Sequence, residues 1–169
     1  MKGGTHLAGA LAAAATYDML APETLPPIEG GWEAAVFFGA SLLGGLVPDI
    51  CHPQSKAGRR ASVFSWLIRR IFGHRTFTHS LIFLVLIAVL TGTIPGTIGE
   101  MIQLGAFIGM ASHYILDMLT SRGIQLFYPI DTTVRFPFHT RTGSWIGEGS
   151  VNVLCIAWVT YYGMWMVGI

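Results

Sequence analysis

LIFLVLIAVLTGTIPGTIGEMIQLGAFIGMASHYILD, residues 81–117, is a long apolar stretch in which Glu100 and Asp117 are the only residues with charged side chains. It contains two segments, 81–95 and 98–116, whose lengths approach the roughly 20 residues that a helix needs to cross the hydrocarbon core of a bilayer. A pair of consecutive membrane-spanning helices is therefore expected here.

The composition of the whole chain supports this expectation. Of its 169 residues 52% are hydrophobic and 11% are charged, whereas charged residues make up roughly 25% of a typical soluble domain. Mean hydropathy is +0.57, and the formal net charge is only +1. These values argue against a disordered chain and against a nucleic-acid binder. Two cysteines, Cys51 and Cys155, are too few for a disulfide framework.

Further apolar stretches extend the pattern along the chain. We predict a single all-α membrane domain, residues 1–169, with about five spans. The second and third of these are short for a full crossing, so thin spans or re-entrant segments are alternatives. The five predicted spans are 7–21, 34–47, 81–95, 98–116 and 151–169.

The distribution of charge predicts the orientation of these spans, because Lys and Arg accumulate in cytoplasmic loops. With a cytoplasmic N-terminus, every basic residue is Lys2 or lies in one of two inner loops, 48–79 and 117–150. The N-terminal stretch also resembles a signal peptide, but its removal would worsen this charge partition. Within the first inner loop, residues 61–72 have a helical apolar pattern. They are expected to form either an interfacial helix or a linker helix packed on the protein.

Histidines and aspartates gather at the predicted inner ends of four different spans. His113 and Asp117 are four residues apart, which places them on one face of a helix. Thr78 is expected to cap the third span and to orient its neighbour. Ionisable groups at membrane depth are costly and usually functional, so the set predicts a metal site. The candidate ligands are His6, Asp49, His52, His79, His113 and Asp117.

This donor set suits Zn²⁺, with Mn²⁺ or Fe²⁺ as alternatives. Six ligands exceed what one tetrahedral ion needs, so two divalent ions are expected. Paired ions are typical of hydrolases that activate water and clamp the oxygens of a phosphoester.

Other polar residues on the inner loops are candidates for substrate handling. Arg75 has a guanidinium that is able to hold a phosphate, and His74 is expected to assist proton transfer. Arg122 and Arg141 are further candidate phosphate ligands, and Glu148 and His139 are possible additional metal or supporting groups. Each also has a simpler interpretation as a surface charge or, for Arg75 and Arg122, as an ion-pair partner of a carboxylate.

Four local motifs carry a family resemblance. They are Thr5-His6, the segment PDICH at 48–52, the segment HRTFTHS at 74–80, and the segment HYILD at 113–117. With Glu148, they resemble the YdjM-type inner-membrane, metal-dependent hydrolases of bacteria and archaea over nearly the whole chain. The ligand order is also distantly similar to that of zinc-dependent phospholipase C, although this sequence lacks the N-terminal Trp ligand of those enzymes.

The resemblance implies a metal-dependent hydrolase in the inner membrane, and the site's cytoplasmic position favours a lipid-like phosphoester as substrate. A metal transporter or sensor and an intramembrane peptidase or amidase are the alternatives. The peptidase is less favoured because the sequence lacks a His-Glu-x-x-His motif. We expect membrane lipid as the environment, no nucleic-acid partner and no evident protein partner, while self-association stays open.

Overall fold

The computed structural model describes residues 1–168 apart from 22–30, 53–54, 56–57, 60–61 and 73–74. The described chain is helical, and its only β-structure is two isolated bridges, Thr120 with Thr140 and Ile124 with Val134. This confirms the all-α prediction. The elements in order are α1 (Gly3–Leu20), α2 (Trp32–Gly44), η1 (Val47–Cys51), α4 (Ser62–Phe72), η2 (Phe77–His79), α5 (Leu81–Gly92), α6 (Gly96–Met118) and α7 (Gly147–Met166).

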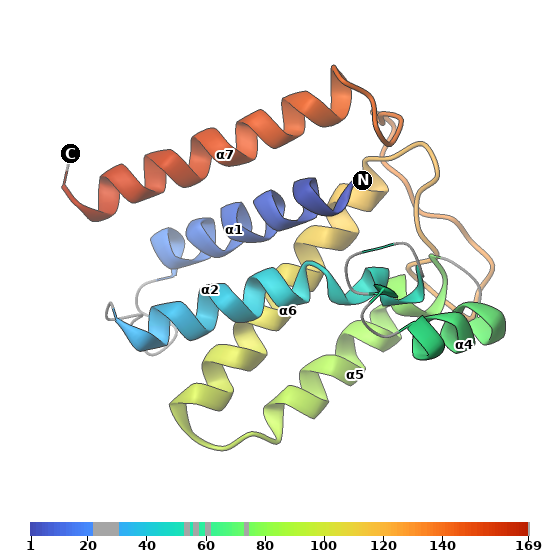
Figure 1. Ribbon diagram of the computed structural model, residues 1–169, viewed down its shortest axis with the longest axis horizontal. Coiled ribbons are helices and arrows are strands. Elements are labelled where there is room, and N and C mark those ends of the chain that lie inside the picture. The colour runs from blue at the N-terminus through green and yellow to red at the C-terminus, as the bar shows by residue number, and fades with distance from the viewer. Residues whose placement is uncertain (22–30, 53–54, 56–57, 60–61, 73–74, 169) are drawn as a thin grey trace.

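Helix α6 is the centre of the arrangement. It packs against α1, α2 and α5, while α7 packs along α1 on the far side from α5 (Figure 1). The chain alternates direction, so the start of α1, the end of α2, the start of α5 and the end of α6 meet at one end of the molecule. Segments η1 and η2 lie at this end and contact each other. One end of the bundle therefore collects residues from four helices.

Small residues set the closest helix contact, which is between α2 and α6. A Cβ atom added to Gly109 would lie 2.0 Å from the carbonyl oxygen of Ser41, and one added to Gly105 would lie 2.3 Å from that of Phe37. Gly44 faces the backbone of Ala106 just as closely. Glycines let two helix backbones approach in this way, and the close approach places Gly45 beside the C-terminal part of α6.

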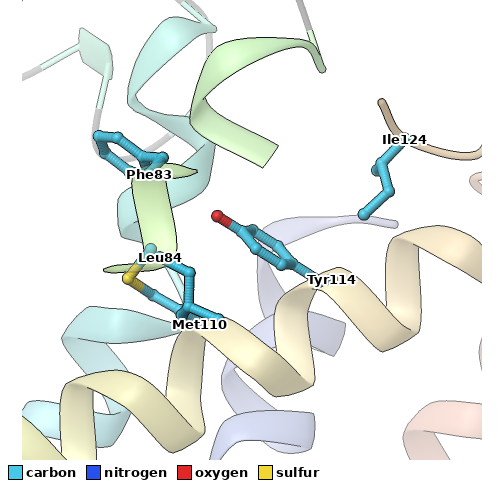
Figure 2. Packing of buried hydrophobic residues seen from close by; sticks show 5 residues of the cluster. All are labelled: Phe83, Leu84, Met110, Tyr114 and Ile124. Atoms are coloured by element: carbon cyan, nitrogen blue, oxygen red, sulfur yellow. The ribbon is translucent and has the colours of Figure 1, made fainter. Parts of the chain in front are cut away.

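Apolar packing stabilises this end of the bundle. Phe83 and Leu84 of α5 pack with Met110 and Tyr114 of α6, and Ile124 completes the buried cluster (Figure 2). The Tyr114 hydroxyl donates hydrogen bonds to the carbonyl oxygens of residues 78 and 80, at 3.0 and 3.1 Å. These bonds hold η2 against α6.

The helix bounds differ from the predicted spans in detail. Among the described residues, one helical stretch, Trp32–Cys51, has the length and hydropathy to cross a membrane, and α5 is a shorter apolar helix. Helix α6 is the longest, at 23 residues. Five helices thus overlap the five predicted segments.

The predicted helix cap at Thr78 is wrong. Thr78 lies in η2, and α5 is capped by Ser80, whose hydroxyl accepts a hydrogen bond from the Phe83 N–H. The reason is that Phe77–His79 form the separate turn η2, so α5 begins only after Ser80.

The helix predicted at 61–72 is present as α4. Its exposed apolar side chains follow a helical spacing on one face, and Ser65 is buried on the other. The guanidinium of Arg70 lies 5.3 Å above the ring of Trp66. The exposed apolar side chains are Val63, Trp66, Leu67 and Ile71.

Candidate metal centre

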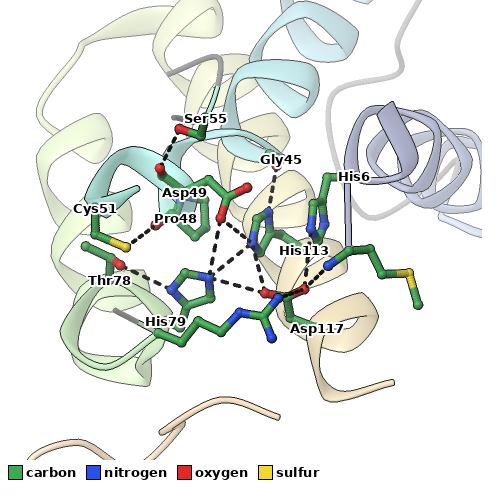
Figure 3. A network of polar contacts seen from close by, with 12 residues as sticks. His6, Gly45, Pro48, Asp49, Cys51, Ser55, Thr78, His79, His113 and Asp117 are labelled. Carbon is green, nitrogen blue, oxygen red and sulfur yellow. Dashed lines mark hydrogen bonds and ion pairs between the residues drawn. The ribbon is translucent and has the colours of Figure 1, made fainter. Parts of the chain in front are cut away.

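The structure brings five of the six predicted ligands into one buried cluster (Figure 3). They come from α1, η1, η2 and α6, and four of the five are fully buried. Their ligand atoms form two overlapping groups in which all atoms lie within 4.8 Å of one another, and His113 belongs to both groups. We call this set the His/Asp cluster: His6, Asp49, His79, His113 and Asp117.

The orientation of His113 is fixed by the α2–α6 contact. Its Nδ1 lies 2.8 Å from the carbonyl oxygen of Gly45. A carbonyl only accepts hydrogen bonds, so Nδ1 carries a proton. In the neutral form of the ring, Nε2 then presents a lone pair to the cluster. That lone pair faces two carboxylates, with Asp117 Oδ2 at 3.6 Å and Asp49 Oδ1 at 3.9 Å. Acceptor atoms face one another here, and their lone pairs repel. A cation bound between them would turn this repulsion into attraction.

His79 presents its Nε2 to the same point. Its Nδ1 lies 3.1 Å from the hydroxyl of Thr78, and its Nε2 lies 3.2 Å from Nε2 of His113 and 3.4 Å from Oδ2 of Asp117. Burial lowers the pKa of His79 to about 4. The ring is therefore neutral near pH 7, and the neutral imidazole is the form that binds metals.

His6 gives the strongest indication of a missing ligand. Its ring is fully buried and stacks on His113 with centroids 3.6 Å apart. Neither ring nitrogen makes a hydrogen bond with the described residues, and Oδ2 of Asp117 likewise accepts none. A buried polar atom without a partner costs roughly 1–3 kcal/mol, so an arrangement with several of them is expected to bind something.

The distances in the cluster suit a tetrahedral ion. Two ligands about 2.1 Å from such an ion lie roughly 3.4 Å apart. Nε2 of His79, Nε2 of His113 and Oδ2 of Asp117 are separated by 3.2 to 3.6 Å, and Oδ1 of Asp49 lies 3.9 to 4.0 Å from both imidazoles. The three atoms from His79, His113 and Asp117 therefore suit one ion. Asp49 lies in the second group of ligand atoms, with His6 and His113, so His6 and Asp49 remain for another ion.

Two cationic groups border the cluster at Asp117. Nη2 of Arg75 lies 3.0 Å from Oδ1, and the Met1 amino group also contacts this oxygen. Nη1 of Arg75 donates to the hydroxyl of Thr120 at 3.0 Å. Arg75 is therefore an ion-pair partner of Asp117, which was the alternative to its predicted phosphate role. Its backbone has a φ of 62°, a left-handed conformation that is rare for a residue with a side chain.

Other predicted residues lie away from the His/Asp cluster. His52 follows η1 but belongs to neither group of ligand atoms in the described chain. His139 is exposed and contacts the carbonyl oxygen of Pro137. Arg122 lines a pocket with Arg75, whereas Arg141 is exposed on the loop before α7. His74 lies outside the described residues, so its predicted role stays a prediction.

Glu148 supports the N-terminal segment instead of facing the cluster. Its carboxylate accepts hydrogen bonds from the backbone N–H groups of Lys2 and Gly143 and from the Thr5 hydroxyl, which lies 2.9 Å away. Burial alone would raise the pKa of Glu148, but these donors outweigh it and hold the pKa below its usual range. Because Thr5 precedes His6, Glu148 is a positioning residue for α1.

Two supporting contacts were missed from the sequence. The carbonyl oxygen of Gly45 has no sequence signal, because every residue has one. The link from Glu148 to the N-terminal segment joins residues more than 140 positions apart. The only available sequence signal was the presence of Glu148 near the predicted inner end of the last span.

The chain that carries this cluster matches a known family over nearly its whole length. The family model of the YdjM inner membrane protein matches residues 1–168. The chain belongs to the YdjM family. The uncharacterized protein YvsG of Bacillus subtilis is 38% identical over 167 residues, which is 97% of this chain and 96% of that protein.

The YdjM inner membrane protein of Escherichia coli is 39% identical over 114 residues, or 64% of this chain and 56% of that protein. The inner membrane protein YdjM of Shigella flexneri matches to the same extent. No solved structure is a significant match. The resemblance to the YdjM family is confirmed, and the distant similarity to zinc-dependent phospholipase C stays a prediction.

Proposed function

We propose that this YdjM-family protein is a membrane-bound, metal-dependent hydrolase. The observation that carries the proposal is the His/Asp cluster, in which buried imidazole and carboxylate acceptors converge and His6 lacks any hydrogen-bond partner among the described residues. If the cluster bound no ligand, the free-energy cost of burying these polar atoms would not be offset.

The residues of the cluster have distinct proposed roles. His79, His113 and Asp117 would hold a divalent ion, with zinc favoured and manganese or iron as alternatives. We propose a second ion at His6 and Asp49, which lie in the other group of ligand atoms. When bound, such ions lower the pKa of water and polarise an ester oxygen. Gly45 and Thr78 contact the Nδ1 atoms of the two imidazoles, so the Nε2 atoms would be available to the ions.

We propose a five-span arrangement in the inner membrane with the His/Asp cluster at the cytoplasmic face. Membership of a family named for an inner membrane protein supports the location. The outward faces of α5 and α7 support the spans, because they expose large apolar side chains that suit lipid. Val85 and Val89 of α5 and Val153 and Leu154 of α7 are each more than half exposed.

We infer a phosphoester as substrate, entering from the inner leaflet. Arg75 places a positive charge directly beside Asp117, and basic residues are concentrated in the two predicted inner loops. A phosphate with an apolar tail combines an anion for these charges with a tail that stays in lipid. A phospholipid or an isoprenoid phosphate has this chemistry.

Metal content of detergent-purified protein tests the proposal. We expect at least one equivalent of zinc, manganese or iron in the wild type and in the control His139→Ala, which removes an exposed imidazole. The double variant His113→Ala/Asp117→Ala should lose the metal. The metal-loaded wild type should then hydrolyse phosphatidic acid or an isoprenoid phosphate, and the double variant should not.

Two results would contradict the proposal. A wild-type protein that stays metal-free after incubation with all three ions would remove its basis. Metal binding without hydrolysis, together with metal flux in proteoliposomes, would establish the transporter instead.

A further inference from the structure

A polar pocket lies next to the His/Asp cluster and is separate from it. Its volume is about 200 Å³, and its lining includes Arg75, Thr76, Arg122, Gln125 and Thr133. Pockets for drug-sized ligands span roughly 300–1,000 Å³. This pocket is therefore suited to a small group and not to an entire lipid.

The charge of the pocket favours an anion. Two of the lining side chains are guanidinium groups, and no lining residue is acidic. Asp131 accepts a hydrogen bond from the lining residue Gln125 at 2.6 Å. Arg75 pairs with Asp117, which does not line the pocket. Hydroxyls of Thr76 and Thr133 add donors of the kind that bind phosphate oxygens.

Arg75 connects the pocket to the cluster. Nη2 binds Asp117 and Nη1 binds Thr120, while the buried Nε has no hydrogen-bond partner among the described residues. An Arg side chain has five N–H donors in one plane. The same guanidinium therefore faces Asp117 with one edge and still has a donor to offer to a further acceptor.

The wall of the pocket is fixed by backbone contacts. The N–H of Gln125 donates to the carbonyl oxygen of Arg75 at 3.1 Å, and Ile124 pairs with Val134 through two hydrogen bonds. Gly123 has a φ of 62°, and a Cβ atom there would lie 2.5 Å from the carbonyl oxygen of Val134. The pocket is therefore built by contacts that exist without a ligand.

We propose that this pocket binds a phosphate-type anion that is not the group reacting at the His/Asp cluster. If the protein is the proposed hydrolase, its substrate would carry a second anionic group near the bond that is cleaved. Only this consequence rests on the proposed function. The anion site itself can exist without hydrolysis, because none of its lining residues is a candidate metal ligand.

Binding of inorganic phosphate to the metal-free protein in detergent tests the site. Titration calorimetry should show saturable binding to the wild type. Arg122→Gln and Thr133→Val should each weaken it, with at least a tenfold rise in Kd for Arg122→Gln. Arg59→Gln removes an exposed arginine that does not line the pocket and should leave Kd unchanged. Equal binding in Arg122→Gln and Arg59→Gln would overturn the proposal, as would the absence of saturable binding in the wild type.

A second pair of measurements separates the sources of the anion and the two proposals. The first measures binding of inorganic phosphate to the protein in nanodiscs of phosphatidylcholine with and without phosphatidic acid. Weaker phosphate binding in the presence of phosphatidic acid indicates that the site takes a lipid headgroup. Equal binding indicates a free phosphate or a soluble ester. Metal content of Arg122→Gln should match that of the wild type. Phosphate binding that depends on Arg122 in a protein that takes up no metal would retain the anion site and reject the hydrolase.

Discussion

His79 and His113 present the same nitrogen to the cluster because each has its other nitrogen held by a neighbour, Thr78 or the carbonyl oxygen of Gly45. Such contacts to the far side of a ligand fix ring orientation and commonly account for a 10- to 100-fold change in metal affinity. The two contacts differ in how they can be tested, since only Thr78 acts through a side chain.

Replacing Thr78 by valine tests the support of His79. Thr78→Val keeps the shape of the side chain and removes its hydroxyl, so we expect zinc affinity to fall about 10-fold or more while all five cluster residues remain. Competition with a chromogenic chelator measures the change. The matched control is Thr93→Val, because the Thr93 hydroxyl is exposed and bonds only within its own turn. Equal zinc affinity in the two variants would show that Thr78 does not orient His79.

Glu148 gives a prediction about pH at the residue scale. Its pKa is below the usual range in the folded protein, so its hydrogen bonds stabilise the fold above roughly pH 4.3, its unfolded pKa, and this stabilisation is lost as pH falls through the folded pKa. Glu148→Gln should lower the free energy of unfolding at pH 7 by about 1 kcal/mol. The difference from the wild type should shrink toward pH 3.

Thermal unfolding in detergent at pH 7 and at pH 3 measures this effect. Glu100→Gln is the control, because Glu100 is exposed on the first turns of α6. A stability difference between wild type and Glu148→Gln that is the same at both pH values would exclude the titration of this carboxylate as its cause.

All five members of the cluster were among the six ligands predicted from the sequence, for a physical reason. His6, Asp49, His79, His113 and Asp117 are polar residues beside apolar segments, and the alternation of span direction places all of them at one end. The pairing of Arg75 with Asp117 was only an alternative, because local spacing does not specify contacts between residues 42 positions apart.

At the scale of elements, the glycines between α2 and α6 connect packing to the metal centre. The predicted spans located the five long helices, but they did not reveal that α2 stops at Gly44 and continues as η1. Helix ends depend on cap contacts and on tertiary packing, which apolar periodicity does not encode. The same limit explains why Ser80, and not Thr78, caps α5.

Gly109→Ala tests this connection. The new methyl group would lie 2.0 Å from the carbonyl oxygen of Ser41 and 2.8 Å from the nitrogen of Gly45, so α2 must move away from α6. We expect a loss of stability of about 1–3 kcal/mol and a lower zinc affinity, because Gly45 would no longer hold His113. Thermal unfolding and chelator competition measure the two effects.

The control for this variant lies on the same helix pair. Gly39→Ala places its methyl group in open space on α2, so it should leave zinc affinity unchanged and should not lower stability, because Ala favours a helix over Gly. If Gly109→Ala lost stability but kept wild-type zinc affinity, the close helix contact would be independent of the metal centre.

At the scale of the whole molecule, the arrangement of elements explains why one end carries the chemistry. The residues of the His/Asp cluster and of the proposed anion pocket belong to the end where α1 and α5 start and α2 and α6 finish. Helix α4, which exposes apolar side chains, lies at the same end (Figure 1). In the proposed topology this end faces the cytoplasm, and α4 would rest on the inner leaflet. The opposite end holds the α5–α6 turn, which would face the periplasmic side.

Labelling of single cysteines tests this topology. In a Cys51→Ser/Cys155→Ser background, Thr93→Cys places an exposed thiol at the α5–α6 turn and Thr132→Cys places one on the loop between α6 and α7. A membrane-impermeant maleimide added to intact spheroplasts should label Thr93→Cys and leave Thr132→Cys unlabelled until the membrane is opened. The reason is that the positive charges of the 117–150 loop retain it on the cytoplasmic side. Labelling of Thr132→Cys in intact spheroplasts would show the opposite orientation, with the His/Asp cluster on the outer side. Labelling of neither site, before or after the membrane is opened, would show that the thiols are covered.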